Sequence, residues 1–355
     1  MNNYKSMVIL LLMIYKLNLM VVRCIDYIGS KRRLNQWMFS KINQKFENPF
    51  DTVFLDGCAG IGEVSIYACN QGYKVISNDL MQFSSHIIRG MSCIDKEKFK
   101  QAKKHIKQIN DLPGHAGFFY ENYSASAGRM YFTDYNAQKI DACRGYINSL
   151  DDECLKNYLL YCGLEALSRV QNTTGVQAAF LKKFKKSAKR KYVLDVEWTS
   201  YAPNLIGVYT KDINDLLVDS NVGEDIIYID PPYNERQYGP NYHLYETFVK
   251  YDEPIIKGKT GLRDWSYTRS DFCQKQNFFK FLKSIINRTH ANYMYFNYNS
   301  DGFFTSDELL SFFNDNCIST TLYREKQIRF RSDTKPNRKY NTKSLEEWFF
   351  EISIK

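Results

Sequence analysis

The sequence lacks any apolar run long enough to cross a membrane. The longest, residues 7–15, falls well short of the roughly 20 residues that a spanning helix needs. Lys5 is the only basic side chain ahead of this run, and no small-x-small cleavage site follows it, so a secretory signal is not indicated. We interpret residues 1–22 as an N-terminal extension or an over-long start, with Met20 the expected first residue.

The cysteine spacings of metal-binding proteins are also missing. The nine cysteines are odd in number and widely spread, and they form no Cys-x-x-Cys pair or Cys/His cluster with zinc spacing. We therefore expect no bound metal, and reduced thiols in a cytoplasmic protein. No internal repeat is evident, and the only biased tract is a lysine cluster.

The composition is that of a folded, basic protein. The chain has 355 residues, of which 44% are hydrophobic and 15% aromatic, which is ample for two ordinary domains. It carries 48 Lys and Arg against 39 Asp and Glu, a net charge of +9. Such an excess favours a polyanionic partner, although many basic proteins bind no nucleic acid.

A glycine-rich turn follows the first strand-like segment. The apolar run that begins at Thr52 leads into Asp56 and then glycines 57, 60 and 62, and an amphipathic stretch begins at residue 64. Glycines at such a turn let the backbone approach a ligand, and Asp79, after the next strand-like run, is placed to accept hydrogen bonds from ribose hydroxyls. The pattern predicts a nucleoside site, although a purely structural turn is the alternative.

A second motif ends another strand-like run, residues 225–229. The residues Asp230, Pro231, Pro232 and Tyr233 set a carboxylate, two prolines and an aromatic ring at the end of this run. A planar ring with an amino group, such as adenine, could donate N–H to the carboxylate and to a carbonyl fixed by proline, and stack on Tyr233. The simpler alternative is a turn at which strand pairing stops.

The lysine cluster lies at residues 182–191. It holds seven cations and no acid, namely Lys182, Lys183, Lys185, Lys186, Lys189, Arg190 and Lys191. Phe180, Leu181, Phe184 and Ala188 would share one face of a helix, leaving the cations on the other. We interpret the segment as a phosphate-contacting helix, with a merely solvated basic helix as the alternative.

Alternating strands and helices predict an α/β fold with a mainly parallel sheet. Strands are expected at 52–56, 74–77, 205–210, 225–229, 293–297, 320–330 and 348–354, and helices at 64–69, 158–170, 277–287 and 306–313, with Ser306 as a helix cap. Ligands bind such sheets at the carboxyl ends of the strands, where both motifs lie. The alternation fades between about residues 91 and 203. We expect catalytic parts at 23–90 and 205–355 around a recognition domain at 91–204.

Three motifs together resemble the Dam-like, or D12, class of DNA adenine-N6 methyltransferases. Residues 27–31, Tyr-Ile-Gly-Ser-Lys, resemble the N-terminal cofactor motif of that class, residues 56–62 its glycine-rich motif, and residues 230–233 its DPPY motif. Residues 295–302 are similar to a later strand-and-turn motif. The string 234–238, with Tyr242 and His243, is most similar to the restriction-modification branch.

The resemblance implies a Rossmann-like fold that uses S-adenosyl-L-methionine, with an inserted, mainly helical domain that binds double-stranded DNA. It implies that Lys31, Asp56 and the backbone of Gly60 and Gly62 hold the methionine end of the cofactor. It assigns Asp79 to the ribose and Asp212 to the adenine amino group, and it adds Tyr27 to the same site. For each single acid a surface or capping role is the alternative.

The same resemblance gives the catalytic and DNA-binding expectations. Asp230 to Tyr233 would grip a flipped adenine, so that the N6 lone pair becomes available to the methyl group. Besides the lysine cluster, Arg236, Tyr238 and His243 are candidate DNA contacts, with a helix-surface position as the alternative for His243. Cys58 and Ile61 depart from the family pattern, and the loss of a phenylalanine at position 58 is expected to weaken cofactor binding.

We expect a monomer without membrane association. A cognate restriction endonuclease would be a functional companion and not a physical one. Three other functions stay open from the sequence: transfer to cytosine N4, transfer to adenine in RNA, and DNA binding without catalysis.

Overall fold

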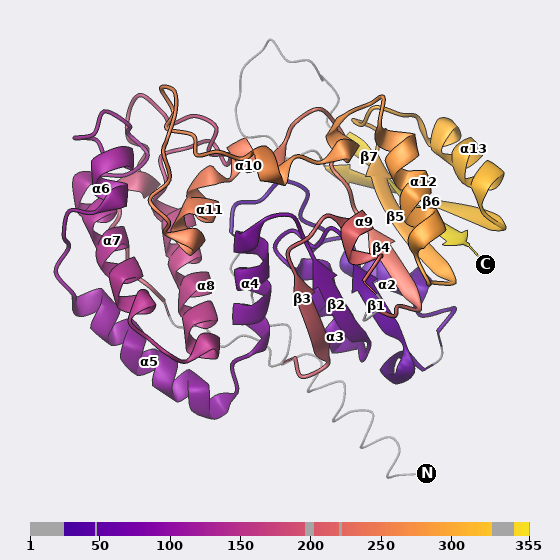
Figure 1. Cartoon of the computed structure of the whole chain (residues 1–355), viewed down its shortest axis with the longest axis horizontal. Helices are drawn as coiled ribbons and strands as arrows, with labels where there is room; N and C mark the ends of the chain where they lie inside the picture. Colours follow the sequence, from indigo (N-terminus) through magenta and orange to yellow (C-terminus); the bar gives the residue numbers. More distant parts are fainter. Residues whose placement is uncertain (1–24, 47, 196–201, 220–221, 329–343, 355) are drawn as a thin grey trace.

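The computed structural model describes residues 25–46, 48–195, 202–219, 222–328 and 344–354. The N-terminal apolar run and the proposed start at Met20 lie outside these residues. Figure 1 shows two lobes side by side, one built on a sheet and the other on helices, with α4 and α11 towards the middle. Within the described residues, no helix is both long and apolar enough to cross a membrane.

One sheet of seven strands forms the first lobe. In sheet order the strands are β3 (Leu205–Tyr209), β2 (Lys74–Asn78), β1 (Val53–Asp56), β4 (Ile226–Ile229), β5 (Tyr293–Asn299), β7 (Ser344–Ser353) and β6 (Ser319–Ile328). The first five are parallel, whereas β7 is antiparallel to both β5 and β6. The prediction of a mainly parallel α/β sheet is confirmed, although position 330, at the expected end of β6, lies outside the described residues.

Helices cover both faces of the sheet because the central strands are apolar on both sides. Phe54 of β1 packs into a core that includes α2 (Asn35–Ile42) and α3 (Glu63–Gln71). Its neighbour Leu55 points into a second core with α9 (Ile213–Leu216), α12 (Phe278–Arg288) and α13 (Ser306–Asn316). Burial on both faces explains why β1 and β4 consist almost entirely of apolar residues.

The cap of α13 differs by one residue from the expectation. Thr305, and not Ser306, accepts the backbone N–H of Glu308, and the Glu308 side chain accepts the N–H of Thr305 in return. This reciprocal pair satisfies two helix N–H groups, whereas Ser306 receives a hydrogen bond from Arg324.

The second lobe is helical. Its helices are α4 (Gln82–Ser92), α5 (Lys96–Asp111), α6 (Phe118–Tyr123), α7 (Asp134–Asn148), α8 (Glu153–Val170) and α11 (His243–Lys250). Buried α8 packs against α4, α5 and α7. The helix α11, which follows the DPPY motif in sequence, packs against α4 and α8, so this lobe takes in chain beyond the expected range 91–204.

The lysine cluster is not the helix that its spacing predicts. Only Ser187–Lys189 (η2) is helical, as a single 3-10 turn. The side chain of Asn172 forms hydrogen bonds with the backbone of this segment: it donates to Leu181 O and accepts from Lys185 N. A side chain that pairs with the backbone in this way competes with helix formation.

The expectation of nine reduced cysteines is wrong for one pair. Cys93, at the end of α4, and Cys154, in the first turn of α8, form a disulfide with their Cα atoms 5.8 Å apart. Nothing in the sequence pointed to this pair, because the two cysteines are separated by 61 positions along the chain. The remaining described cysteines, Cys58, Cys69, Cys143, Cys162, Cys273 and Cys317, are free.

Candidate active site

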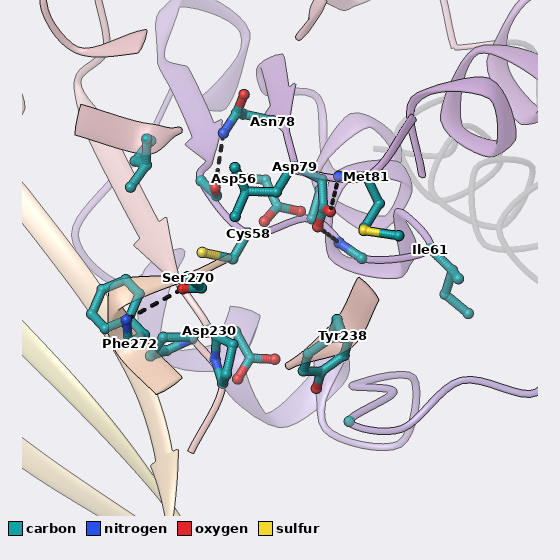
Figure 2. A pocket seen from close by; sticks show the side chains of 18 of the residues that line it. Asp56, Cys58, Ile61, Asn78, Asp79, Met81, Asp230, Tyr238, Ser270 and Phe272 are labelled. Carbon is teal, nitrogen blue, oxygen red and sulfur yellow. Dashed lines mark hydrogen bonds between the residues drawn. The ribbon is translucent and has the colours of Figure 1, made fainter. Parts of the chain in front are cut away.

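A pocket opens at the carboxyl ends of β1, β2 and β4, where the two sequence motifs meet. Its empty volume is about 990 Å³. Figure 2 shows Asp56, Cys58 and Asp79 along one side of it and Asp230 and Tyr238 on the other. Every residue that the sequence assigned to a cofactor, except Gly62, lines this pocket, as do all four residues of the DPPY motif.

The glycine-rich turn is shaped for close contact. Gly60 and Gly62 have φ angles of +54° and +78°, which other L-residues rarely adopt. A Cβ atom on Gly60 would lie 2.8 Å from the Tyr27 ring, and one on Gly62 would lie 2.5 Å from Ile88. Gly62 therefore lets α3 approach α4, while Gly60 keeps the turn close to Tyr27.

Asp79 holds this turn in place. Its two carboxylate oxygens accept hydrogen bonds from the backbone N–H groups of Gly60 and Met81, each at 2.9 Å. Burial raises the pKa of Asp79 to about 6, and these hydrogen bonds oppose the shift. Asp79 lines the pocket, so a ribose contact remains a prediction.

Asp56 is buried at the end of β1, and within the described residues only one of its two carboxylate oxygens accepts a hydrogen bond. Ser65 donates to Oδ2 at 2.6 Å, and Ser77 in turn donates to Ser65 at 2.6 Å. Among the described residues Oδ1 has no hydrogen-bond partner. Burial raises the pKa of Asp56 to about 7, with Ser65 opposing the shift. A cationic ligand would satisfy Oδ1 and favour the ionised carboxylate.

The carboxylate of Asp230 lies in a cluster of polar groups. Lys31 Nζ is 3.0 Å from Asp230 Oδ2, and the Tyr233 hydroxyl donates to Asp230 Oδ1. Lys31 also donates to Tyr233, and the Lys31 ammonium lies 5.1 Å from the centre of the Tyr233 ring. Burial raises the pKa of Asp230, and Lys31 opposes the shift. The Lys31 pKa is raised, because Asp230 and Glu347 outweigh the burial that would lower it.

Glu347 is a member of this cluster that the sequence analysis missed. It lies on β7, 3.8 Å from Lys31 Nζ, and it accepts hydrogen bonds from Asn297 at 3.2 Å and Asn299 at 3.4 Å. Burial raises its pKa, and Lys31 opposes the shift. The only signal in the sequence is an acid beside an aromatic strand, which gives no indication of the strand that β7 pairs with.

The backbone at the end of the DPPY motif is held by two hydrogen bonds from β5 and the segment after it. The carbonyl oxygen of Tyr233 accepts from Phe303 N at 3.0 Å and from the Tyr298 hydroxyl at 3.1 Å. Tyr298 also packs edge-on against the Tyr233 ring, with centroids 5.1 Å apart. The later motif at 295–302 therefore supports the DPPY turn directly.

Asp212 lines the pocket and also caps a short helix. Its Oδ1 accepts from Asn214 N at 2.8 Å at the start of α9, and burial raises its pKa. The capping role considered as its alternative is thus present, and contact with an adenine amino group remains a prediction. Four pocket residues from the segment after α11 and from α12 were not foreseen: Thr268, Ser270, Phe272 and Phe281.

The candidate DNA contacts Arg236, Tyr238 and His243 differ in their exposure to solvent. Arg236 is exposed, and Tyr238 lines the pocket, with its ring 5.6 Å from that of Tyr27. The expectation of a DNA contact or surface position for His243 is wrong, because this residue is fully buried and hydrogen-bonded to Gln177 O at 3.0 Å. Burial lowers the pKa of His243 to about 4, so it is neutral near pH 7.

The cations of the lysine cluster are not equivalent. Lys182, Lys183, Lys186, Lys189 and Arg190 are exposed. Lys185 is half-buried, and its Nζ donates to Thr173 O at 2.8 Å. The exposed cations remain candidate DNA contacts, whereas Lys185 also holds its own segment to the preceding loop.

Both departures from the family pattern are at the pocket wall. Cys58 and Ile61 line it, and burial raises the pKa of the Cys58 thiol well above its usual value. The thiol is therefore neutral and acts as a small apolar group. Weaker cofactor binding remains a prediction.

The profile of the D12 class N6 adenine-specific DNA methyltransferases matches residues 27–298. The chain is 34% identical over 334 residues to the type II methyltransferase M.NlaIII of Neisseria lactamica, covering 91% of this chain and 97% of that protein. It is 32% identical to M.CviAII of Paramecium bursaria Chlorella virus 1, covering 81% and 87% respectively. It is also 33% identical to M.FokI of Planomicrobium okeanokoites, but spans only 52% of that longer protein. The chain belongs to the D12 class of N6 adenine-specific DNA methyltransferases.

Proposed function

We propose that the protein transfers the methyl group of S-adenosyl-L-methionine to the N6 atom of an adenine flipped out of double-stranded DNA. The observation that carries this proposal is the shared pocket of Asp230 and the glycine-rich turn. A purine amino group at Asp230 and a nucleoside cofactor at the turn would lie next to each other in it.

The residues present fit this cofactor. The unpartnered Oδ1 of Asp56 suits a cationic amino group, and the turn around Gly60 leaves no room for a side chain. Asp79 would contact the ribose and Asp212 the adenine. The cofactor supplies a methyl group on a positively charged sulfur, which is an electrophile without any help from the protein. The protein therefore needs to orient it and exclude water.

Asp230 activates the amino nitrogen. The lone pair of an aromatic amine is delocalised into its ring, so two acceptors for its hydrogens help the nitrogen to pyramidalise. Asp230 and the peptide carbonyl beside it would be these acceptors. N6 would accept the methyl group that the cofactor supplies, and the bonding electrons would leave with its sulfur. N6 then loses a proton, which Asp230 accepts and passes to solvent.

Lys31 and Tyr233 would keep the Asp230 carboxylate ionised before DNA binds. Their hydrogen bonds oppose the burial that raises the Asp230 pKa, and so favour the ionised form. The incoming amino group would replace the hydroxyl of Tyr233 at Asp230, which frees the ring to stack on the base. The location of Lys31 beside Asp230 adds this role to the cofactor contact expected from its motif.

The exposed cations of the lysine cluster would bind DNA phosphates, with Arg236 closer to the target base. Since M.NlaIII and M.CviAII are type II methyltransferases, we infer that this chain is the modification enzyme of such a restriction-modification system. It would act as a monomer in the cytoplasm, with a cognate endonuclease that shares its DNA site and does not bind it.

A direct test is the transfer of tritiated methyl groups from the cofactor to unmodified duplex DNA, followed by mass spectrometry of the nucleosides. N6-methyladenine is the expected product. N4-methylcytosine, product in RNA alone, or DNA binding without transfer would each refute the proposal. Long-read sequencing of DNA from a host that expresses the protein would then give the sequence around the modified base.

A further inference from the structure

A β-hairpin that follows α11 carries a positively charged tip. The backbones of Lys257 and Leu262 pair in both directions, at 2.8 and 2.9 Å. Between them Gly261 N donates to Gly258 O at 3.3 Å, so Lys259 and Thr260 occupy the centre of a tight turn. Both glycines have positive φ angles, +72° and +67°. This geometry places Lys259 at the tip.

The base of the hairpin is held firmly to the helical lobe. Buried Arg263 forms two hydrogen bonds with Asp252, at 3.0 and 2.7 Å. Tyr251 donates to Asp141 of α7 at 3.0 Å, and its ring lies 5.0 Å from the guanidinium of Arg144. Such a base limits the entropy that the tip would lose on binding a ligand.

The tip rests on the loop that follows α6. Arg129 donates to Gly258 O at 3.4 Å, and Tyr123 donates to Gly261 O at 3.0 Å. A Cβ atom on Gly261 would lie 2.9 Å from the Arg129 side chain, so glycine is needed for this approach. Above Gly258, by contrast, a Cβ atom would meet nothing within 4 Å. The tip is thus supported from below and open on its outer side.

The charge of this tip is unbalanced. Residues 254–263 contain Lys257, Lys259 and Arg263 and no acid, and Arg263 is paired with Asp252. Both lysines are exposed, and neither forms an ion pair with another described residue. The next acid, Asp264, accepts hydrogen bonds from the N–H and hydroxyl of Ser266 at 3.0 Å. Both ammonium groups therefore remain exposed on a rigid support, while the pKa of Asp264 is lowered by the Ser266 hydrogen bonds and by Lys257.

The hairpin is connected to the pocket through a short series of contacts. The hydroxyl of Tyr131 bonds both to Thr260 O at 3.1 Å and to Gln177 O at 2.8 Å. Gln177 N donates to Asn241 O at 2.7 Å, in the helix α10 (Tyr238–Asn241) whose first residue lines the pocket. In Figure 1 the loops after α11 rise at the top of the helical lobe, on the same side as α10.

We propose that the tip at 257–260 is a second DNA-binding element, in which Lys257 and Lys259 contact backbone phosphates of the duplex beside the flipped base. This inference rests on the proposed function. It adds a contact from chain beyond the DPPY motif to that of the lysine cluster at 182–191. Because phosphates are the target, the element strengthens binding to every DNA sequence and does not select a base.

The test is the affinity for duplex DNA as a function of salt, with the double variant Lys257→Ala, Lys259→Ala. Each phosphate contact contributes about 0.9 to the slope of log affinity against log salt, so losing two should make the slope shallower by about 1.8. If affinity at about 1 M salt is unchanged, binding near 0.15 M weakens roughly 30-fold. Cofactor affinity and turnover at saturating DNA should equal those of the unmodified protein.

The matched control is Lys104→Ala, Lys107→Ala, which removes the same charge from the exposed face of α5. In Figure 1 α5 runs along the opposite edge of the helical lobe. If the salt slope of the hairpin variant equals that of this control, the inference is overturned. The proposed function would still stand in that case, provided that the unmodified protein methylates DNA. If the unmodified protein failed to methylate DNA, the proposed function itself would fail.

Discussion

The replacement Asp230→Ala tests the catalytic proposal most directly. It removes both carboxylate oxygens, one paired with Lys31 at 3.0 Å and the other with the Tyr233 hydroxyl. Breaking a buried ion pair commonly costs about 3–5 kcal/mol, because the partner keeps an uncompensated charge. Here Glu347 remains 3.8 Å from Lys31, so we expect a smaller loss of stability and a folded variant.

The effect on the reaction should be much larger. Loss of a preorganised electrostatic contact typically lowers kcat about 10²–10³-fold, and loss of a proton acceptor about 10²–10⁴-fold. Asp230 serves in both ways, so single-turnover methylation should fall at least about 10³-fold. The Kd of the cofactor, measured by calorimetry, should change less than about threefold, because Asp230 contributes no contact to its binding in the proposed arrangement.

A control for this experiment is Asp215→Ala, which removes an exposed acid from α9. Turnover of the Asp230 variant within tenfold of the control would refute the role given to this carboxylate. A large loss of cofactor affinity in a folded variant would instead mean that Asp230 belongs to the cofactor site.

Three further predictions concern the cofactor site and the lysine cluster. Replacing Lys182, Lys183, Lys186 and Lys189 by Gln should weaken binding to all duplexes and reduce the salt slope by up to about 3.6, and an unchanged slope would make the cluster ordinary surface. Cys58→Phe should lower the cofactor Kd about three- to tenfold by filling the pocket wall, which calorimetry would show; weaker binding by a variant of normal stability would contradict this. Because the pKa of Asp56 is raised to about 7, its carboxylate is largely protonated below that pH, and the cofactor amino group should bind more tightly as pH rises through 7. The same shift makes the Asp56 contribution to the free energy of unfolding fall as pH rises from about 4 to 7, because in this range the folded state holds a proton that the unfolded state has lost. The variant Asp56→Asn should remove both pH dependences.

The sheet and the two motifs could be predicted because their signals are local. The strands β1, β2 and β4 are largely apolar runs that end at the pocket, and parallel strands place their ends at one edge. Asp56 and Asp230 could therefore be assigned to one pocket from the sequence alone. The same reasoning located Tyr233 and Asp79, although their hydrogen-bond partners were not foreseen.

Features that depend on distant pairing could not be predicted in this way. Glu347 reaches Lys31 only because β7 inserts antiparallel between β5 and β6. His243 has the polar character of a surface residue, yet Gln177 and the packing of α11 bury it. The lysine cluster has the residue spacing of a helix, but the Asn172 side chain accepts a hydrogen bond from Lys185 N, which competes with helical pairing there. Partners remote in sequence determine all three.

The return of α11 to the helical lobe has a consequence for attempts to change DNA specificity. Exchanging residues 91–204 with those of a relative would leave α11 and its hairpin behind, although both pack into that lobe. The new helices would then meet a foreign buried surface around His243 and Phe248. A chimera that exchanges residues 82–204 together with 238–270 would include α4 as well, transplant the whole helical unit and keep its interior matched.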